Sequence, residues 1–245
     1  MTAEASPLRT APSRREENGA SIFTWSTSQP LLHARYRLEW RSRAQARIGR
    51  ESKGVQVDEV RPGEQMRNLG VVQQGAPLLT ETARRFDLPA ERDVAERAVE
   101  TLFASMDRIA HVHTFAKGMG IAAPQLGVGR AAAVVQPAET GAGVVVLLNP
   151  RVIDVSEEFD AQYEGCLSFF DVRGVVPRPL RITVETTVLD GTMVTTVYER
   201  GLARLVQHEI DHLEGHLYTN RMRPGVEPIP VEKYRQSGRA WAYES

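Results

Sequence analysis

A His-Glu-x-x-His signature near the end of the chain constrains the fold and the chemistry more than any other feature. It runs from His208 to His212, in a stretch with the apolar spacing of a helix. Residues four apart lie one turn apart on the same helix face, so both imidazoles can reach a single divalent metal ion. Glu209 lies about 100° around the helix from His208, close enough to handle protons at that metal without being a ligand.

The alternative interpretation is a coincidental pair of histidines on a solvated helix surface. Apolar residues on both sides of the signature argue against it, because they predict a buried helix, and buried histidines need partners. The metal interpretation is therefore favoured. The flanking apolar residues are Leu202, Leu205, Val206, Ile210 and Leu213.

A catalytic metal of this type usually takes three protein ligands and keeps one position open, so a third ligand is needed. His216 lies about 12 Å along an unbroken helix from the first histidine. Glu227 and Glu232 follow in a Pro-rich stretch without a helical pattern. Cys166, the only cysteine, offers a thiolate, which is a good soft ligand. A single cysteine is more often a small buried apolar residue, but Gly165 before it permits close approach of the backbone.

A glycine-rich segment, Gly118 to Gln125, also stands out. Two glycines two residues apart, followed by small residues, indicate a backbone that another group approaches closely. As a dinucleotide-binding fingerprint the segment is poor, because no clear strand precedes it and Pro124 interrupts the helix that should follow.

Taken together and in this order, three segments resemble the motifs of the peptide deformylases. Residues 118–125 match the family's Gly-x-Gly-x-Ala-Ala-x-Gln, and residues 164–168 match Glu-Gly-Cys-Leu-Ser without change. Residues 207–212 match Gln-His-Glu-x-Asp-His on a helix. The similarity covers residues 69–222. Phe169 and Phe170 depart from the family, where a small aliphatic residue and a proline are common, so the mouth of the cleft is expected to differ.

This resemblance implies a fold, a reaction and a metal. The fold is α+β, with short mixed or antiparallel sheets around a central metal-binding helix. The reaction is hydrolysis of the N-formyl group of N-formylmethionyl peptides of nascent proteins, with release of formate. The metal is one Fe²⁺ ion, with Zn²⁺, Ni²⁺ or Co²⁺ as substitutes, and its ligands are Cys166, His208 and His212.

The resemblance also implies roles for the residues around the metal. Glu209 transfers protons, while the Gln125 side chain and the Leu167 backbone N–H stabilise charge on the formyl oxygen. Other residues are expected to contact the peptide, either as walls of the methionine pocket or through backbone and side-chain hydrogen bonds. These residues are Met119, Gly120, Arg173 and Leu205.

Two other functions remain open on the sequence alone. The same hydroxide and base could serve a metallopeptidase that cleaves internal amides, although Tyr218 stands where one protease class has its last histidine ligand. A catalytically inactive binding module is the third hypothesis, and the presence of every ligand and of Glu209 argues against it.

The composition divides the chain into three parts. Residues 1–66 form an N-terminal extension, with a disordered tail and a basic helix at 32–50 that either docks on the domain or contacts the ribosome. Residues 67–225 form the catalytic domain, and residues 226–245 form a C-terminal tail. Within the domain the pattern predicts helices at 91–111 and 201–213, and strands at 71–72, 131–135, 144–148, 151–155, 181–189 and 192–198.

Charge and cysteine content limit the partners and the cellular location that are expected for the chain. The formal net charge of -1 gives no bias toward nucleic acid or an anionic membrane. No apolar run approaches the roughly 20 residues of a membrane span, and the N-terminus lacks the apolar core of a secretory signal. A lone cysteine cannot form an internal disulfide, so a reducing cytoplasm is the expected location, without membrane or DNA partners.

Overall fold

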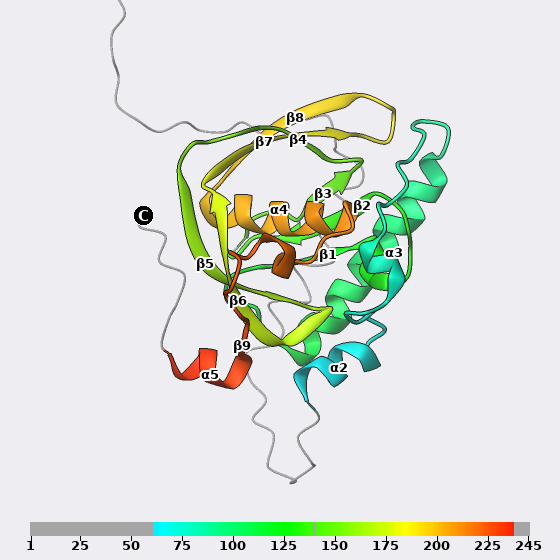
Figure 1. Cartoon of the computed structure of the whole chain (residues 1–245). Coiled ribbons are helices and arrows are strands. Elements are labelled where there is room, and N and C mark those ends of the chain that lie inside the picture. Colours follow the sequence, from blue (N-terminus) through cyan, green and yellow to red (C-terminus); the bar gives the residue numbers. More distant parts are fainter. Residues whose placement is uncertain (1–60, 140, 238–245) are drawn as a thin grey trace, which may run out of the picture.

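The computed structural model describes residues 61–139 and 141–237, so the predicted disordered tail and the basic helix at 32–50 lie outside the described residues. Within these ranges, short antiparallel sheets surround helix α4 (Arg200–Leu213), and helix α3 (Arg92–Val112) packs along one side (Figure 1). The predicted α+β class with a central helix is confirmed. Both predicted helices are confirmed to within one residue at each end.

The first sheet separates the two helices. Its order is β1 (Met119–Ala122), β2 (Ala132–Gln136) and β3 (Val145–Leu148). Side chains alternate across a strand, and β2 is buried on both faces. Ala132 and Val134 belong to the same core cluster as α3, whereas Ala133 and Val135 belong to the cluster that contains α4. Strand β2 therefore lies between the two helices and sets the position of α4 relative to β1, which carries part of the glycine-rich segment.

A second sheet covers the other side of α4, with the order β4 (Arg151–Val155), β7 (Arg181–Thr187) and β8 (Met193–Glu199). Strands β7 and β8 form a hairpin through Asp190 and Gly191, as the sequence predicts. Gly191 has a φ of +89°, a conformation that glycine adopts without steric cost.

The third sheet carries the cysteine motif, and the sequence analysis missed it. It consists of β5 (Phe159–Cys166), β6 (Phe169–Pro179) and β9 (Ile229–Pro230). A tight turn at Leu167 and Ser168 joins the two long strands. The register shifts between Glu164 and Cys166, so the end of β5 departs from the regular ladder. This irregularity lies where the chain approaches α4.

Short elements complete the fold. Helix α2 (Pro62–Asn68) begins five residues before the expected domain boundary at 67; its Met66 is fully buried, and the Gly63 N–H donates to Asp171 Oδ1 at 2.7 Å. The predicted strand at Val71–Val72 is wrong, because neither residue lies in a strand. Three 3₁₀ turns, η2 (Pro77–Thr80), η3 (Ala123–Leu126) and η4 (Tyr218–Arg221), connect larger elements.

The described part of the predicted C-terminal tail is structured. Strand β9 pairs with β6 through Val172 and Arg173, and helix α5 (Val231–Gln236) follows directly. Val231 is 1% exposed, which anchors the start of this helix. No helix among the described residues is long and apolar enough to cross a membrane.

Candidate active site

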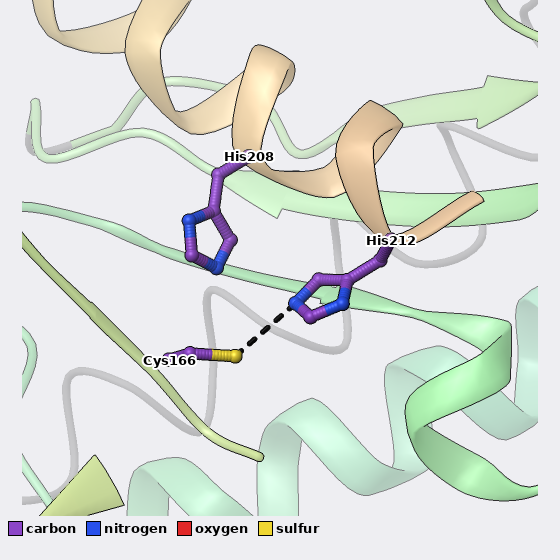
Figure 2. Close-up of side chains that lie close together, drawn as sticks. All are labelled: Cys166, His208 and His212. Atoms are coloured by element: carbon purple, nitrogen blue, oxygen red, sulfur yellow. Dashed lines mark hydrogen bonds between the residues drawn. The ribbon is translucent and has the colours of Figure 1, made fainter. Parts of the chain in front are cut away.

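Three segments that are distant in the sequence meet at one point beside α4. Cys166 ends strand β5, and His208 and His212 project from consecutive turns of α4 toward it (Figure 2). One ligand atom from each residue lies within 4.8 Å of the others, and all three side chains are buried. These distances suit a single metal ion bound by a sulfur and two nitrogens.

Gly165 allows the cysteine to reach this position. A Cβ atom at Gly165 would lie 2.5 Å from the guanidinium carbon of Arg173, so any larger residue would displace the Arg173 side chain. The Arg173 guanidinium is held there because Nη1 donates to the carbonyls of Phe170 and Val172 at 2.7 and 2.8 Å. The close packing explains why a glycine precedes the cysteine.

Hydrogen bonds orient the two imidazoles. Nδ1 of His208 lies 3.0 Å from Glu164 Oε2, so the carboxylate accepts a hydrogen bond from the Nδ1–H group and Nε2 is directed toward the cluster. Nε2 of His212 lies 3.1 Å from Cys166 Sγ. Both rings therefore present Nε2 to the same point.

The electrostatics of the cluster favour a cation at its centre. Burial alone would raise the pKa of the Cys166 thiol, but the imidazoles of His212 and His208 hold this pKa well below its usual value. Burial likewise opposes protonation of His208, yet the Cys166 sulfur and the Glu164 carboxylate raise the pKa of His208 well above its usual value. A thiolate and buried imidazoles are the donor set of a borderline-soft divalent metal, so the residues fit such an ion.

A network of buried charges supports the cluster from behind. Arg178 donates to both carboxylate oxygens of Glu164 at 2.9 Å, and Arg204 donates to Glu164 Oε1 at 2.6 Å. Arg178 also donates to Asp211 Oδ2 at 2.7 Å. Burial would raise the pKa of Glu164, but the Arg178 guanidinium holds it well below its usual value. Glu164 therefore stays ionised and keeps its hydrogen bond to His208.

Glu209 lies in a different environment from Glu164, although it too is buried. Burial raises its pKa to about 7, and the nearby imidazoles only partly offset this effect. Its Oε2 atom is buried without a hydrogen-bond partner among the described residues. A Cβ atom at Gly120 would lie 2.3 Å from Glu209 Oε1, so the glycine of β1 leaves room for this carboxylate. A base with a pKa near neutrality suits proton transfer in both directions.

Gln125 reaches the cluster from the turn η3. Its Oε1 accepts from the Ala122 backbone N–H at 2.8 Å, which fixes the amide and directs Nε2 inward. Nε2 lies 3.5 Å from Cys166 Sγ and 3.2 Å from Ser168 Oγ. The amide therefore presents a donor beside the candidate metal ligands.

One cavity is lined by nearly all of the residues that the sequence predicted to be functional. All of the predicted catalytic, substrate-binding and metal-ligating residues line it except His212, which lies deeper. At its inner end Leu205 and Met119 provide apolar walls, and a Cβ at Gly118 would lie 2.8 Å from Leu205 Cδ1.

Sequence reasoning missed two sets of residues. The buried partners Arg178 and Arg204 gave no signal, because an arginine in a strand or helix is usually exposed. Apart from Phe170, which the sequence analysis expected at the mouth of the cleft, the outer wall of the cavity was missed because its members come from segments without motifs. That wall is lined by His113, Phe115, Lys117, Tyr163, Phe170, Tyr234 and Arg235.

Comparisons with known proteins show which family the chain belongs to. The polypeptide deformylase family model matches residues 69–227. The chain is 35% identical over 147 residues to a peptide deformylase of Acetivibrio thermocellus, which covers 60% of this chain and 82% of the relative. It is also 35% identical over 173 residues to a peptide deformylase of Lactobacillus helveticus, covering 66% and 94% of the two chains.

Solved structures give the same result. The Met-Ala-Ser-bound class I type b peptide deformylase from Acinetobacter baumannii aligns with a TM-score of 0.54 at 31% identity, covering 62% of this chain and 96% of that one. An inhibitor complex of Arabidopsis thaliana peptide deformylase 1B aligns with a TM-score of 0.55 at 30% identity, covering 68% and 86%.

Fold and site together define a metal-dependent hydrolase with a cysteine and two histidines able to hold one ion. The chain belongs to the peptide deformylase family, enzymes that remove the N-formyl group from nascent peptides.

Proposed function

We propose that this chain hydrolyses the formamide bond of N-formylmethionyl peptides and that Cys166, His208 and His212 hold one Fe²⁺ ion for the reaction, with Zn²⁺, Ni²⁺ or Co²⁺ able to substitute. The convergence of the three ligand atoms within 4.8 Å is the observation that carries the proposal. A divalent cation bound there supplies a Lewis acid and lowers the pKa of water from 15.7 toward about 7.

Glu209 is the proton carrier of the proposed reaction. Its carboxylate accepts a proton from the water that attacks the formyl carbon, and it then gives that proton to the departing methionyl nitrogen. The C–N bond of the formamide breaks, and the products are formate and a free amino terminus. Burial of Glu209 beside Gly120 supports this role, because a pKa of about 7 makes both transfers accessible at neutral pH.

Gln125 and Leu167 stabilise the negative charge that develops on the formyl oxygen. The Gln125 amide is directed inward by its bond to the Ala122 N–H, and Leu167 lies next to the cysteine ligand in the turn after β5. A preorganised donor of this kind is typically worth about 3 kcal/mol of the barrier.

The remaining predicted residues bind the peptide. Met119 and Leu205 form apolar walls that accept the methionine side chain, and both line the cavity. Gly120 lies in β1, where its backbone can pair with an extended peptide as an added strand would. Arg173 lines the same cavity farther along β6 and contacts the peptide beyond the methionine.

We also propose that the reaction takes place in the cytoplasm on peptides that emerge from the ribosome. The predicted ribosome contact through residues 32–50 stays a prediction. Co-sedimentation of the intact chain and of a chain that starts at Arg61, which keeps α2, with ribosomes tests it, and equal binding by both would exclude this role of the extension.

The proposed reaction is tested with formyl-Met-Ala-Ser and with the unformylated peptide Met-Ala-Ser, using the iron-loaded intact chain under anaerobic conditions. We expect release of formate from the first peptide and no cleavage of the second. Cleavage of an internal peptide bond, or no release of formate at all, would contradict the proposal.

A further inference from the structure

The C-terminal segment forms part of the candidate substrate cleft. Strand β9 pairs with β6 at Val172 and Arg173, directly after the cysteine motif, and this pairing brings α5 alongside the cavity. Figure 1 shows α5 beside β9, at the edge of the molecule below α4. Three residues of α5, Val231, Tyr234 and Arg235, line the cavity together with the loop that precedes β1.

Contacts between α5 and this loop are specific. Lys117 Nζ donates to the Tyr234 hydroxyl at 2.7 Å, and it also lies 5.5 Å from the centre of the Tyr234 ring. On its other side, Tyr234 packs on Tyr163 of β5 with 5.1 Å between ring centres. The outer wall is therefore a packed arrangement of side chains from three separate segments.

The outer wall is positively charged. Lys117, Arg173, Arg204 and Arg235 all line the cavity, and of these Arg204 is bound to the Glu164 carboxylate. Among the described residues that line it, the carboxylates are Glu164 and Glu209. The first is held by the buried Arg178 and Arg204, and the second lies beside Gly120 next to the metal ligands. The two acids thus lie beside the cluster of Cys166 and the histidines, whereas Lys117 and Arg235 belong to the outer wall, which the loop before β1 and α5 help to form.

The cations influence each other. Partial burial, together with the positive charges of Arg173 and Arg204, lowers the pKa of Lys117 to about 8. Arg235 and Arg173 both act on His113 and lower its pKa together with burial. At neutral pH Lys117 still carries its proton, so an anionic group placed here would relieve repulsion among like charges.

We propose that this outer wall selects formylated peptides that carry Asp or Glu within the two residues after the methionine. The inference rests on the proposed deformylation, since that reaction places the formyl group at the metal ligands and directs the rest of the peptide outward. An extended chain rises about 3.3 Å per residue, so the second and third residues lie beyond the methionine pocket, toward Lys117 and Arg235.

The test uses amidated formyl-Met-Ala-Glu, formyl-Met-Ala-Gln and formyl-Met-Ala-Lys, so that no terminal carboxylate interferes. A second series places the charge in the middle residue. Each charge pair at a partly exposed site is worth up to about fivefold in binding. We expect kcat/KM for the Glu peptide to exceed that for the Lys peptide by about five- to tenfold at low salt. The ratio should fall toward one at 1 M salt, where screening acts over about 3 Å.

Variants that remove a positive charge show which side chains produce the preference for the Glu peptide. Lys117→Gln and Arg235→Gln should each lower the Glu-to-Lys ratio, and the double variant should bring it near one. Lys233→Gln is the matched control, because Lys233 is exposed on the same helix and does not line the cavity. Its ratio should equal that of the intact chain.

The outcomes separate the two proposals. Equal kcat/KM values for all three peptides, a ratio that salt does not change, or an equal loss in Lys233→Gln would overturn the charge selection while leaving deformylation intact. Failure to deformylate even the neutral Gln peptide would instead contradict the proposed function. Thermal unfolding of each variant confirms that a lost ratio does not come from a lost fold.

Discussion

The inner and outer ends of the cleft use arginines and lysines in opposite ways. At the inner end, Arg178 and Arg204 are 4% and 1% exposed, and both bind the buried carboxylate of Glu164. At the outer end, Lys117 is half-buried and Arg235 is exposed, and their neighbours in the cavity wall are other cations and aromatic rings. The same residue types therefore fix geometry in one region and line the proposed peptide-binding end of the cavity in the other.

This difference follows from desolvation. A buried charge is tolerated only when its hydrogen bonds and its opposite charge are supplied within the protein, so each member of the inner network is needed by the others. A charge at the mouth keeps most of its water and is screened by salt, so it adds little to stability but can discriminate between substrates. Variants at the two ends should therefore differ sharply in what they change.

Arg178→Met should give the largest loss of stability. It leaves the carboxylates of Glu164 and Asp211 without the guanidinium that binds both, and breaking a buried pair costs about 3–5 kcal/mol. Urea unfolding of the metal-loaded chain measures this loss. Arg181→Met is the control, because Arg181 is exposed on the neighbouring strand and should change the free energy of unfolding by less than about 0.5 kcal/mol. Equal losses in the two variants would contradict the inner network.

Gly120→Ala should impair the reaction more than the fold. The added Cβ would lie 2.3 Å from Glu209 Oε1, so the carboxylate must move. A displacement of about 1 Å costs on the order of 10²-fold in rate. Formate release from formyl-Met-Ala-Ser measures the effect, with metal content as the second readout. Gly129→Ala is the control, since its nearest neighbour is the flexible tip of Leu78 at 3.3 Å. Full activity of Gly120→Ala would mean that Glu209 is not confined as described.

Arg235→Gln should leave stability almost unchanged, in contrast to Arg178→Met. The residue is exposed near the end of α5, and such substitutions usually change the free energy of unfolding by no more than about 0.5 kcal/mol. The same urea titration measures it. A loss comparable to that of the buried arginine would show that the outer cations are structural, and the contrast between the two ends would disappear.

Glu91 tests a surface charge in a region away from the cleft. The Asp87 N–H and the Arg130 and Arg84 guanidinium groups lower its pKa to about 2. Because the folded pKa lies below the unfolded value of about 4.3, this interaction stabilises the fold above pH 4.3 and is lost as the pH falls toward 2. Urea unfolding should show Glu91→Gln less stable than the intact chain at pH 6, with a difference that shrinks below pH 4. A constant difference would contradict this account.

The sequence predicted the inner site because its signals are local. Spacing on one helix placed His208 and His212 together, and the glycines at 120 and 165 indicated close approaches that the structure shows against Glu209 and Arg173. The α+β class and both long helices followed from periodicity. Identification of Cys166 as the third ligand depended on the family resemblance, since spacing alone left His216 and two glutamates open.

The third sheet, the outer wall of the cleft and the buried arginine network could not be predicted, because they depend on contacts between segments that are distant in the sequence. Strands β5 and β6 carry polar residues at many positions, so the pattern that marks a half-buried strand is weak there. Helix α5 has six residues, too few for a periodic signal, and only its pairing through β9 brings Tyr234 and Arg235 to the cleft. The partners of Arg178 come from β5 and α4, and no local pattern links them.

The proposed reaction depends most on Glu209 as the proton carrier beside a metal held by Cys166, His208 and His212. The direct test compares formate release from formyl-Met-Ala-Ser by the intact chain and by Glu209→Ala, under anaerobic conditions and with metal analysis of both. We predict that both proteins retain the ion and that the variant loses about 10²- to 10⁴-fold in kcat. A variant that keeps its metal and works within about threefold of the intact chain, well inside that range, would contradict the mechanism.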